Sequence, residues 1–166
     1  LDRAGRPAEP GSPVRAVVGT PGATRGGQWL DLFGRLGLAE RLTDEPRRVG
    51  GVALYGLDHV PPARRDELEY EFAPHGAERA VLVAHGLFTP FAHADWETET
   101  VLAASSVAFD AVLLGDNHAP GTEHVDGVPV SYAGSTERVS AAERDPRGYS
   151  LVSVDDGVEI RRRTLD

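Results

Sequence analysis

The chain has 166 residues, no cysteine and a formal net charge of −9, and 40% of its residues are hydrophobic. This length fits one domain, or a large piece of one, with enough apolar residues for a sizeable core. The lack of cysteine excludes disulfides and thiolate chemistry. No apolar run reaches the roughly 18 residues of a transmembrane helix, and no signal peptide is visible, so we expect a cytoplasmic protein.

The charged residues are unusual in kind, because all 17 basic residues are arginine, against 26 acidic residues. A lysine-free, acidic chain fits a GC-rich genome and a halophilic, salt-adapted cytoplasm. The negative charge argues against a broad nucleic-acid-binding face, although in molar salt the Debye length falls to about 3 Å and net charge says little about partners. Methionine is absent even at position 1, so we expect a processed or excised piece of a longer protein.

Short apolar runs bounded by glycine and proline predict strands buried on both faces, as in the parallel sheet of an α/β domain. Four such runs occupy residues 14–18, 52–57, 80–84 and 109–114. The glycine-rich loop at 20–27 allows a backbone to approach a phosphate. It lacks the lysine of a P-loop, however, so a plain loop is favoured.

Three helices are predicted from spacing and boundary residues. Residues 28–38 carry apolar side chains at helical spacing, and we expect the aromatic Trp29 and Phe33 to lie in the core. Residues 62–71 form a charged helix that begins with proline, and its charged side chains face solvent. Residues 97–105 form a third, short helix.

The last third of the chain predicts two β-hairpins. They cover residues 122–132 and 149–163, with turns at Asp126-Gly127 and Asp155-Asp156-Gly157. Asp-Gly between two short apolar strands is a strong signal for a two-residue hairpin turn. A polar loop at 133–138 lies between the hairpins and is placed to meet the edge of the sheet.

Polar residues follow three of the predicted strands at the point where each strand ends. His59, His85 and the run Gly115-Asp116-Asn117-His118 come after the second, third and fourth apolar runs. In open α/β sheets the chemistry lies just past the carboxyl ends of the strands. If residues 116–118 stay extended, Asp116 and His118 point the same way. One oxygen and two nitrogen ligands suit manganese, iron or zinc.

A simpler interpretation of the same residues stays open. Gly-Asp-Asn-His is a good turn sequence by itself, since glycine, aspartate and asparagine tolerate unusual backbone dihedral angles. A lone histidine at the end of a strand is more often a hydrogen-bonded structural residue than a ligand. His59 ranks below His85 and His118, because the Pro61-Pro62 that follows it is typical of a loop.

Longer stretches resemble a known family. The run at 110–118, the hairpin after it and the run at 132–138 are similar to the second half of a calcineurin-like metallophosphoesterase. The more specific resemblance is to the manganese-dependent nuclease subunit of the DNA double-strand-break repair complex in its haloarchaeal form. Further stretches that carry it are residues 28–33, 52–59 and 83–91. The resemblance implies one partial nuclease domain over residues 1–166, an α/β calcineurin-like β-sandwich flanked by helices, without its N-terminal βαβ units.

The resemblance also implies a two-metal manganese site, in which ions about 4 Å apart orient water and stabilise the leaving oxygen of a phosphodiester. It places metal ligands at His85, Asp116 and His118, with Asp116 standing where the broader family has histidine. In the polar loop that follows, we expect Ser135 and Arg138 to bind substrate.

Two departures from the family pattern predict an incomplete site. The Asp-x-His and Gly-Asp motifs of the family's first two strands have no counterpart in this chain. The family's Gly-Asn-His motif falls on Gly19-Thr20-Pro21, so Pro21 stands at the position of the catalytic histidine. Proline has no side-chain donor and threonine is a poor neutral metal ligand. We therefore assign no catalytic residue and expect little or no hydrolysis from this chain alone.

The resemblance implies a parent protein that is a DNA exo- and endonuclease. It acts with an SMC-like coiled-coil ATPase subunit and, at full length, as a homodimer, with no membrane partner. Two rival functions stay open: a phosphoesterase of the same fold acting on nucleotides or phosphoproteins, and a non-catalytic interaction module. A reading-frame artefact that removed the start and altered residues 20–22 is a further alternative.

Overall fold

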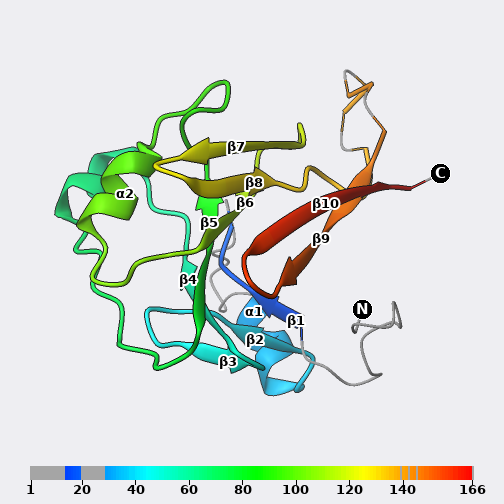
Figure 1. Ribbon diagram of the computed structural model, residues 1–166. Helices are drawn as coiled ribbons and strands as arrows, with labels where there is room; N and C mark the ends of the chain where they lie inside the picture. Colours follow the sequence, from blue (N-terminus) through cyan, green and yellow to red (C-terminus); the bar gives the residue numbers. More distant parts are fainter. Residues whose placement is uncertain (1–13, 20–28, 139, 142, 145, 166) are drawn as a thin grey trace.

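The computed structural model describes residues 14–19, 29–138, 140–141, 143–144 and 146–165. A six-stranded sheet in the order β3-β4-β5-β6-β8-β7 forms its centre, and two two-stranded sheets, β1-β2 and β9-β10, accompany it (Figure 1). The strands are β1 (Val14–Ala16), β2 (Ala39–Arg41), β3 (Arg47–Val49), β4 (Val52–Leu57), β5 (Arg79–Gly86), β6 (Ala111–Asp116), β7 (Gly121–Val125), β8 (Val128–Tyr132), β9 (Gly148–Val154) and β10 (Val158–Thr164). The helices are α1 (Trp29–Arg35), the 3₁₀ helix η1 (Pro62–Glu67) and α2 (Thr98–Ala104). The expectation of a mixed α/β chain with a multistranded sheet is confirmed.

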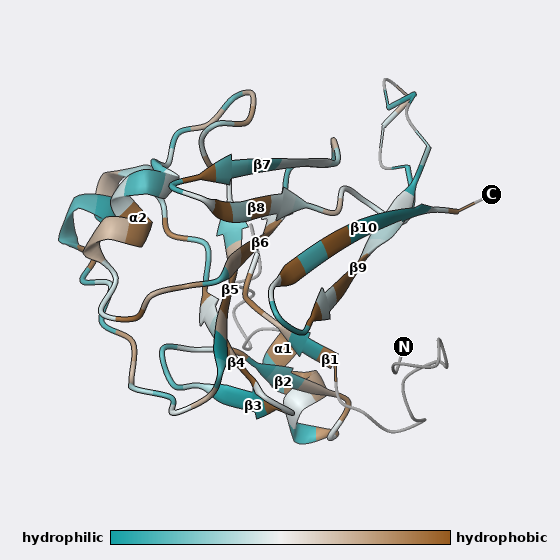
Figure 2. Cartoon of the chain, in the orientation of Figure 1, coloured by the Kyte–Doolittle hydropathy of each residue, from teal (hydrophilic) through white to brown (hydrophobic). Residues whose placement is uncertain are grey.

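The four inner strands β4, β5, β6 and β8 run parallel, and the edge strands β3 and β7 pair antiparallel to them. This parallel core explains why the apolar runs of the sequence are nearly continuous, since parallel strands are covered on both faces. The two edge strands are largely hydrophilic, as Figure 2 shows. Polar edges discourage pairing with another chain.

Alternate residues of the inner strands form one side of the main core. They pack against α2 and the segment that precedes it, and Tyr55, Leu82 and Val130 are fully buried there. The other buried members of this cluster are Ala53, Phe72, Ala80, Ala84, Phe88, Trp96, Val101, Val107, Phe109, Val112, Leu114 and Tyr132. Burial of a large apolar side chain contributes about 1.5–3 kcal/mol. The core therefore fixes the strands whose ends carry the candidate site.

The helix α1 forms within the predicted range 28–38 but ends at Arg35, three residues early, and its predicted burial is wrong. Trp29 is 65% exposed and Phe33 is 43% exposed, and α1 has no buried residue. Helical spacing shows that the apolar side chains share a face, but not that a surface is present for that face to cover. None of the helices in the described ranges is long and apolar enough to cross a membrane.

The predicted helix at 62–71 is shorter than expected, because Leu68 is already extended and η1 stops at Glu67. The predicted helix at 97–105 is confirmed as α2. Both hairpins are confirmed as well, and the first has positive φ at Asp126 (51°) and Gly127 (81°). Positive φ at both central residues defines the type I′ turn that Asp-Gly favours.

Candidate metal centre

The carboxyl ends of β4, β5 and β6 meet at one edge of the sheet because these strands are parallel and in register. His85 pairs with Gly115, and Gly86 pairs with Asp116. The side chains of His85 and Asp116 meet there, with 3.6 Å between Nε2 of His85 and Oδ1 of Asp116. His59 comes just after β4, and the centroid of its ring lies 6.1 Å from that of the His85 ring. The three predicted strand ends therefore converge.

Two glycines confine the imidazole of His85. A Cβ atom placed on Gly19 would lie 2.8 Å from Cε1 of His85, and one on Gly115 would lie 3.1 Å from Nδ1. Real Cβ contacts are longer, so a larger residue at Gly19 would displace the ring. The absence of side chains at Gly19 and Gly115 therefore lets the backbone lie close to the His85 ring on two sides and fix its orientation.

Burial lowers the pKa of His85, and His59 acts in the same direction, while the negative charges of Asp116 and Asp58 oppose the shift. Desolvation disfavours the charged imidazolium. The ring is therefore kept neutral at ordinary pH. Neutral imidazole is the form that binds a metal ion.

The loop after β4 is tied to the end of β1. Asp58 accepts a hydrogen bond of 2.6 Å from the backbone N–H of Val18 and pairs with Arg41, and His59 donates its N–H to the Val18 carbonyl at 2.9 Å. The Nδ1 atom of His59 is buried and has no hydrogen-bond partner among the described residues. An unsatisfied buried polar atom is rare in folded proteins and is consistent with a ligand position.

The backbone does not stay extended through Asp116, which has φ = 102°. The strand alternation that placed Asp116 and His118 on one face therefore fails. His118 is 45% exposed, and its Nδ1 lies 2.8 Å from Oε1 of Glu143. Strained backbone of this kind costs about 1–3 kcal/mol and clusters at functional sites.

The structure thus brings together two of the three predicted ligands, His85 and Asp116, and places His118 beside Glu143. No group of three or more His, Cys, Asp or Glu side chains in the described part of the chain is arranged to hold a metal ion. The full ligand set stays a prediction. Thr20 and Pro21, where the missing catalytic motif was assigned, lie outside the described residues.

Ser135 and Arg138 lie in the loop that follows β8. The hydroxyl of Ser135 accepts a hydrogen bond of 2.8 Å from Nη1 of Arg147, and Arg147 also pairs with Glu143 at 3.1 Å. Arg138 is exposed. Sequence reasoning missed Glu143 and Arg147, and their only signal is the i,i+4 spacing of opposite charges. Substrate binding by Ser135 and Arg138 stays a prediction.

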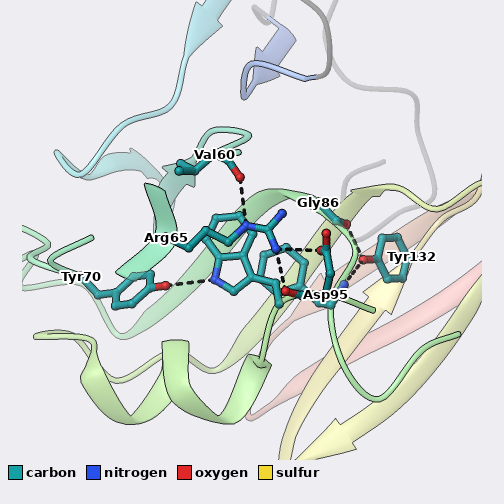
Figure 3. A network of polar contacts seen from close by, with 8 residues as sticks. Val60, Arg65, Tyr70, Gly86, Asp95 and Tyr132 are labelled. Carbon is teal, nitrogen blue, oxygen red and sulfur yellow. Dashed lines mark hydrogen bonds and ion pairs between the residues drawn. The ribbon is translucent and has the colours of Figure 1, made fainter. Parts of the chain in front are cut away.

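Tyr132 fixes the chain directly after His85. Its hydroxyl donates to the Gly86 carbonyl at 2.6 Å and accepts from the backbone N–H of Phe88 at 2.9 Å (Figure 3). Burial raises the pKa of Tyr132 to about 12. The phenol therefore remains protonated and keeps both contacts.

A second polar network supports the loop beyond Phe88. Arg65 donates to the Val60 carbonyl at 2.9 Å and to both the carbonyl and the carboxylate of Asp95, and it lies 4.4 Å above the ring of Trp96 (Figure 3). Trp96 donates its ring N–H to Tyr70 at 3.0 Å. The Arg65 side chain is only 9% exposed, so the expectation that the charged residues of this segment all face solvent is wrong.

Comparison with curated proteins shows what this chain is similar to, although no sequence-family model matches it. The DNA double-strand break repair protein Mre11 of Haloferax volcanii is 71% identical over 157 residues, which is 94% of this chain and 36% of that protein. This chain is similar to part of Mre11. The Mre11 of Halobacterium salinarum is 55% identical over 158 residues, covering 93% of this chain and 41% of that protein.

The similarity extends beyond these two halophilic relatives. The Mre11 of Methanosarcina mazei is 40% identical over 160 residues, covering 92% of this chain and 26% of that protein. Nearly the whole chain is therefore matched in each comparison. The chain itself spans only 26% to 41% of the length of these relatives.

Proposed function

We propose that the parent protein is a DNA double-strand-break repair nuclease of the Mre11 kind. In this proposal residues 1–166 supply part of its calcineurin-like metallophosphoesterase domain. The observation that carries the proposal is the 71% identity over 94% of this chain to a curated repair protein. The parallel sheet with His85 and Asp116 at neighbouring strand ends supports it independently.

The donor atoms fit a divalent metal ion in part. Two atoms that are each about 2.1 Å from one ion stand roughly 3 to 4 Å apart, and Nε2 of His85 lies 3.6 Å from Oδ1 of Asp116. We propose that His85, Asp116 and His118 hold manganese. When bound, such an ion polarises a phosphodiester and lowers the pKa of a water. The protein's own part is to keep His85 neutral and oriented.

The loop after β8 is the proposed contact to the DNA backbone. A Cβ atom on Gly134 would lie 2.9 Å from the His118 carbonyl oxygen, so this loop begins in contact with the proposed ligand segment. Arg138 is exposed on the same loop. An arginine in this position suits a phosphate, because guanidinium binds phosphate oxygens with two parallel hydrogen bonds.

We propose that this chain alone is catalytically incomplete. The residues at the catalytic motif, Thr20 and Pro21, carry neither an amide ligand nor an imidazole. For the parent protein we propose DNA as substrate, a coiled-coil ATPase subunit as partner, homodimerisation at full length and a cytoplasmic location. Each of these follows from the resemblance to the repair nuclease.

The test grafts this chain into the Haloferax volcanii protein in place of the stretch that it matches. We expect the graft to cleave duplex DNA with manganese only when T20N and P21H restore the motif. Adding His118→Ala to the restored graft should abolish cleavage, whereas His124→Ala, a change of an exposed histidine on β7, should not. All four grafts are compared in a gel assay of end-labelled DNA.

Three results would contradict the proposal. Cleavage of DNA by the unrestored graft would show that Thr20 and Pro21 do not inactivate the site. Cleavage of a small chromogenic phosphodiester but not of DNA by the restored graft would favour a phosphoesterase with another substrate. Failure of the restored graft on both substrates, with retained binding to an ATPase coiled coil, would favour a non-catalytic interaction module.

A further inference from the structure

We infer that Glu143 is a positioning residue, which holds His118 in the tautomer that presents Nε2 as a metal ligand. The inference rests on the proposed function, because it assigns His118 to the metal site. It goes beyond that function by naming the residue that prepares the ligand. The relevant contacts are formed by side chains of this chain alone.

The contact between the two side chains determines the position of a proton. Nδ1 of His118 lies 2.8 Å from Oε1 of Glu143. An ionised carboxylate only accepts hydrogen bonds, so Nδ1 must carry the proton when the ring is neutral. The lone pair then lies on Nε2, on the opposite side of the ring. Metal-binding histidines usually donate their other ring N–H to a carboxylate in this way.

The second carboxylate oxygen of Glu143 also has a partner, Arg147. Its second oxygen, Oε2, lies 3.1 Å from Nη1 of Arg147, and the side chains of Glu143 and Arg147 are only 17% and 10% exposed. Nη1 of Arg147 also donates to Ser135 at 2.8 Å. The carboxylate of Glu143 is therefore fixed at both oxygens. It differs in this from an ion pair on the exposed surface, which contributes little to stability.

The loop that carries this network is closed at its base. The N–H of Gly148 donates to the Ser135 carbonyl at 3.2 Å, and the N–H of Leu165 donates to the Arg147 carbonyl at 2.8 Å. Arg147 is thus anchored to the end of β10 while its side chain reaches Glu143. A chain of contacts therefore runs from Ser135 through Arg147 and Glu143 to His118, the proposed ligand, and Arg147 ties it to the end of β10.

An isosteric change should reverse the tautomer. His118 and Arg147 lie at different oxygens of Glu143, and glutamine keeps an oxygen at only one of these two positions, so it can accept a hydrogen bond at only one of them. The guanidinium of Arg147 can only donate and is buried, so we expect it to take the oxygen. The glutamine NH₂ then donates to Nδ1 of His118, and the ring proton moves to Nε2. A protonated Nε2 cannot bind a metal ion.

The first measurement is nitrogen-15 histidine NMR on the metal-free 166-residue chain at about pH 9, well above the ordinary imidazole pKa of about 6.5. The His118 signals are assigned by their loss in His118→Gln. We expect protonated Nδ1 in the unaltered chain and protonated Nε2 in Glu143→Gln. The control, Glu137→Gln, removes the same charge from an exposed position in the same loop and should leave the tautomer unchanged.

The second measurement is manganese binding to the same proteins by calorimetry. Loss of a residue that orients a ligand typically weakens metal binding 10–100-fold. We expect this loss for Glu143→Gln and none for Glu137→Gln. Unchanged signals from the other five histidines would show that the variant is folded.

The outcomes separate this inference from the proposed function. A His118 tautomer that is already protonated at Nε2, or that Glu143→Gln does not change, overturns the inference whether or not manganese binds. A reversed tautomer with unchanged manganese affinity also overturns it. A normal Nδ1 tautomer with no manganese binding to the unaltered chain instead overturns the metal site of the proposed function.

Discussion

Replacing Tyr132 by phenylalanine removes one oxygen atom from the interior and tests how the end of β5 is held. Tyr132 is 1% exposed, and its hydroxyl bridges the Gly86 carbonyl at 2.6 Å and the Phe88 N–H at 2.9 Å. Phenylalanine keeps the ring and its packing. Any loss of stability can therefore be assigned to the hydroxyl.

The magnitude follows from the two contacts. A typical hydrogen bond contributes about 0.5–1.5 kcal/mol net, and a buried partner left unpaired costs about 1–3 kcal/mol. Tyr132→Phe leaves one donor and one acceptor unpaired, so we expect the free energy of unfolding to fall by about 2–4 kcal/mol. Tyr55→Phe is the control, because Tyr55 is also a buried residue and its hydroxyl makes a single hydrogen bond within the described residues, to the Ala73 carbonyl at 2.6 Å. We expect about 1–2 kcal/mol for the control.

Urea unfolding followed by circular dichroism measures both variants. With a slope of roughly 1–3 kcal/mol per molar urea, the Tyr132→Phe midpoint should fall by about 1–2 M, and that of Tyr55→Phe by about half as much. Equal midpoints for the two variants would show that the second hydrogen bond of Tyr132 contributes nothing. The hydroxyl would then not hold the chain after His85.

Three further predictions concern packing, a polar network and pH. Gly56→Ala should lower the free energy of unfolding, measured in urea, by about 1–3 kcal/mol, because the added Cβ would collide with the carbonyl oxygen of Leu42. A value near zero would contradict this contact. Arg65→Met keeps an apolar stem over Trp96 but removes three hydrogen bonds, so the melting temperature should fall by several degrees. An unchanged melting temperature would show that these hydrogen bonds of Arg65 do not stabilise the fold. Burial lowers the pKa of His85, so its stabilising contribution is complete above the ordinary pKa of about 6.5 and is lost as pH falls through the lowered value. His85→Gln should flatten that part of the stability–pH curve, which has a slope of at most about 1.4 kcal/mol per pH unit, and an unchanged slope would refute the assignment.

The parallel strands β4, β5 and β6 and the two hairpins could be predicted because their signals are local. The expectation for residues 14–18 is wrong, since β1 ends at Ala16, pairs with β2 outside the six-stranded sheet and leaves Val14 exposed, and β2 and β3 were not predicted. Apolar runs between glycines gave β4 its full extent, and Asp126-Gly127 specified a turn that requires positive φ at both positions. Parallel strands bring their carboxyl ends together, so the approach of His85 to Asp116 also followed from the sequence.

The remaining features depend on contacts that spacing along the chain does not show. The positive φ of Asp116 turns His118 away from the strand direction, and its partner Glu143 lies 25 residues further along. The exposure of Trp29 depends on which surfaces are present to cover it. The burial of Arg65 depends on Trp96, which supplies a π face for its charge.

A manganese titration by calorimetry shows whether the strand ends of this chain form a metal site. It compares the unaltered chain, His118→Ala and the control His124→Ala. We predict saturable binding to the unaltered chain and the control, and loss of binding in His118→Ala. No binding to any of the three, or equal binding to all of them, would contradict it.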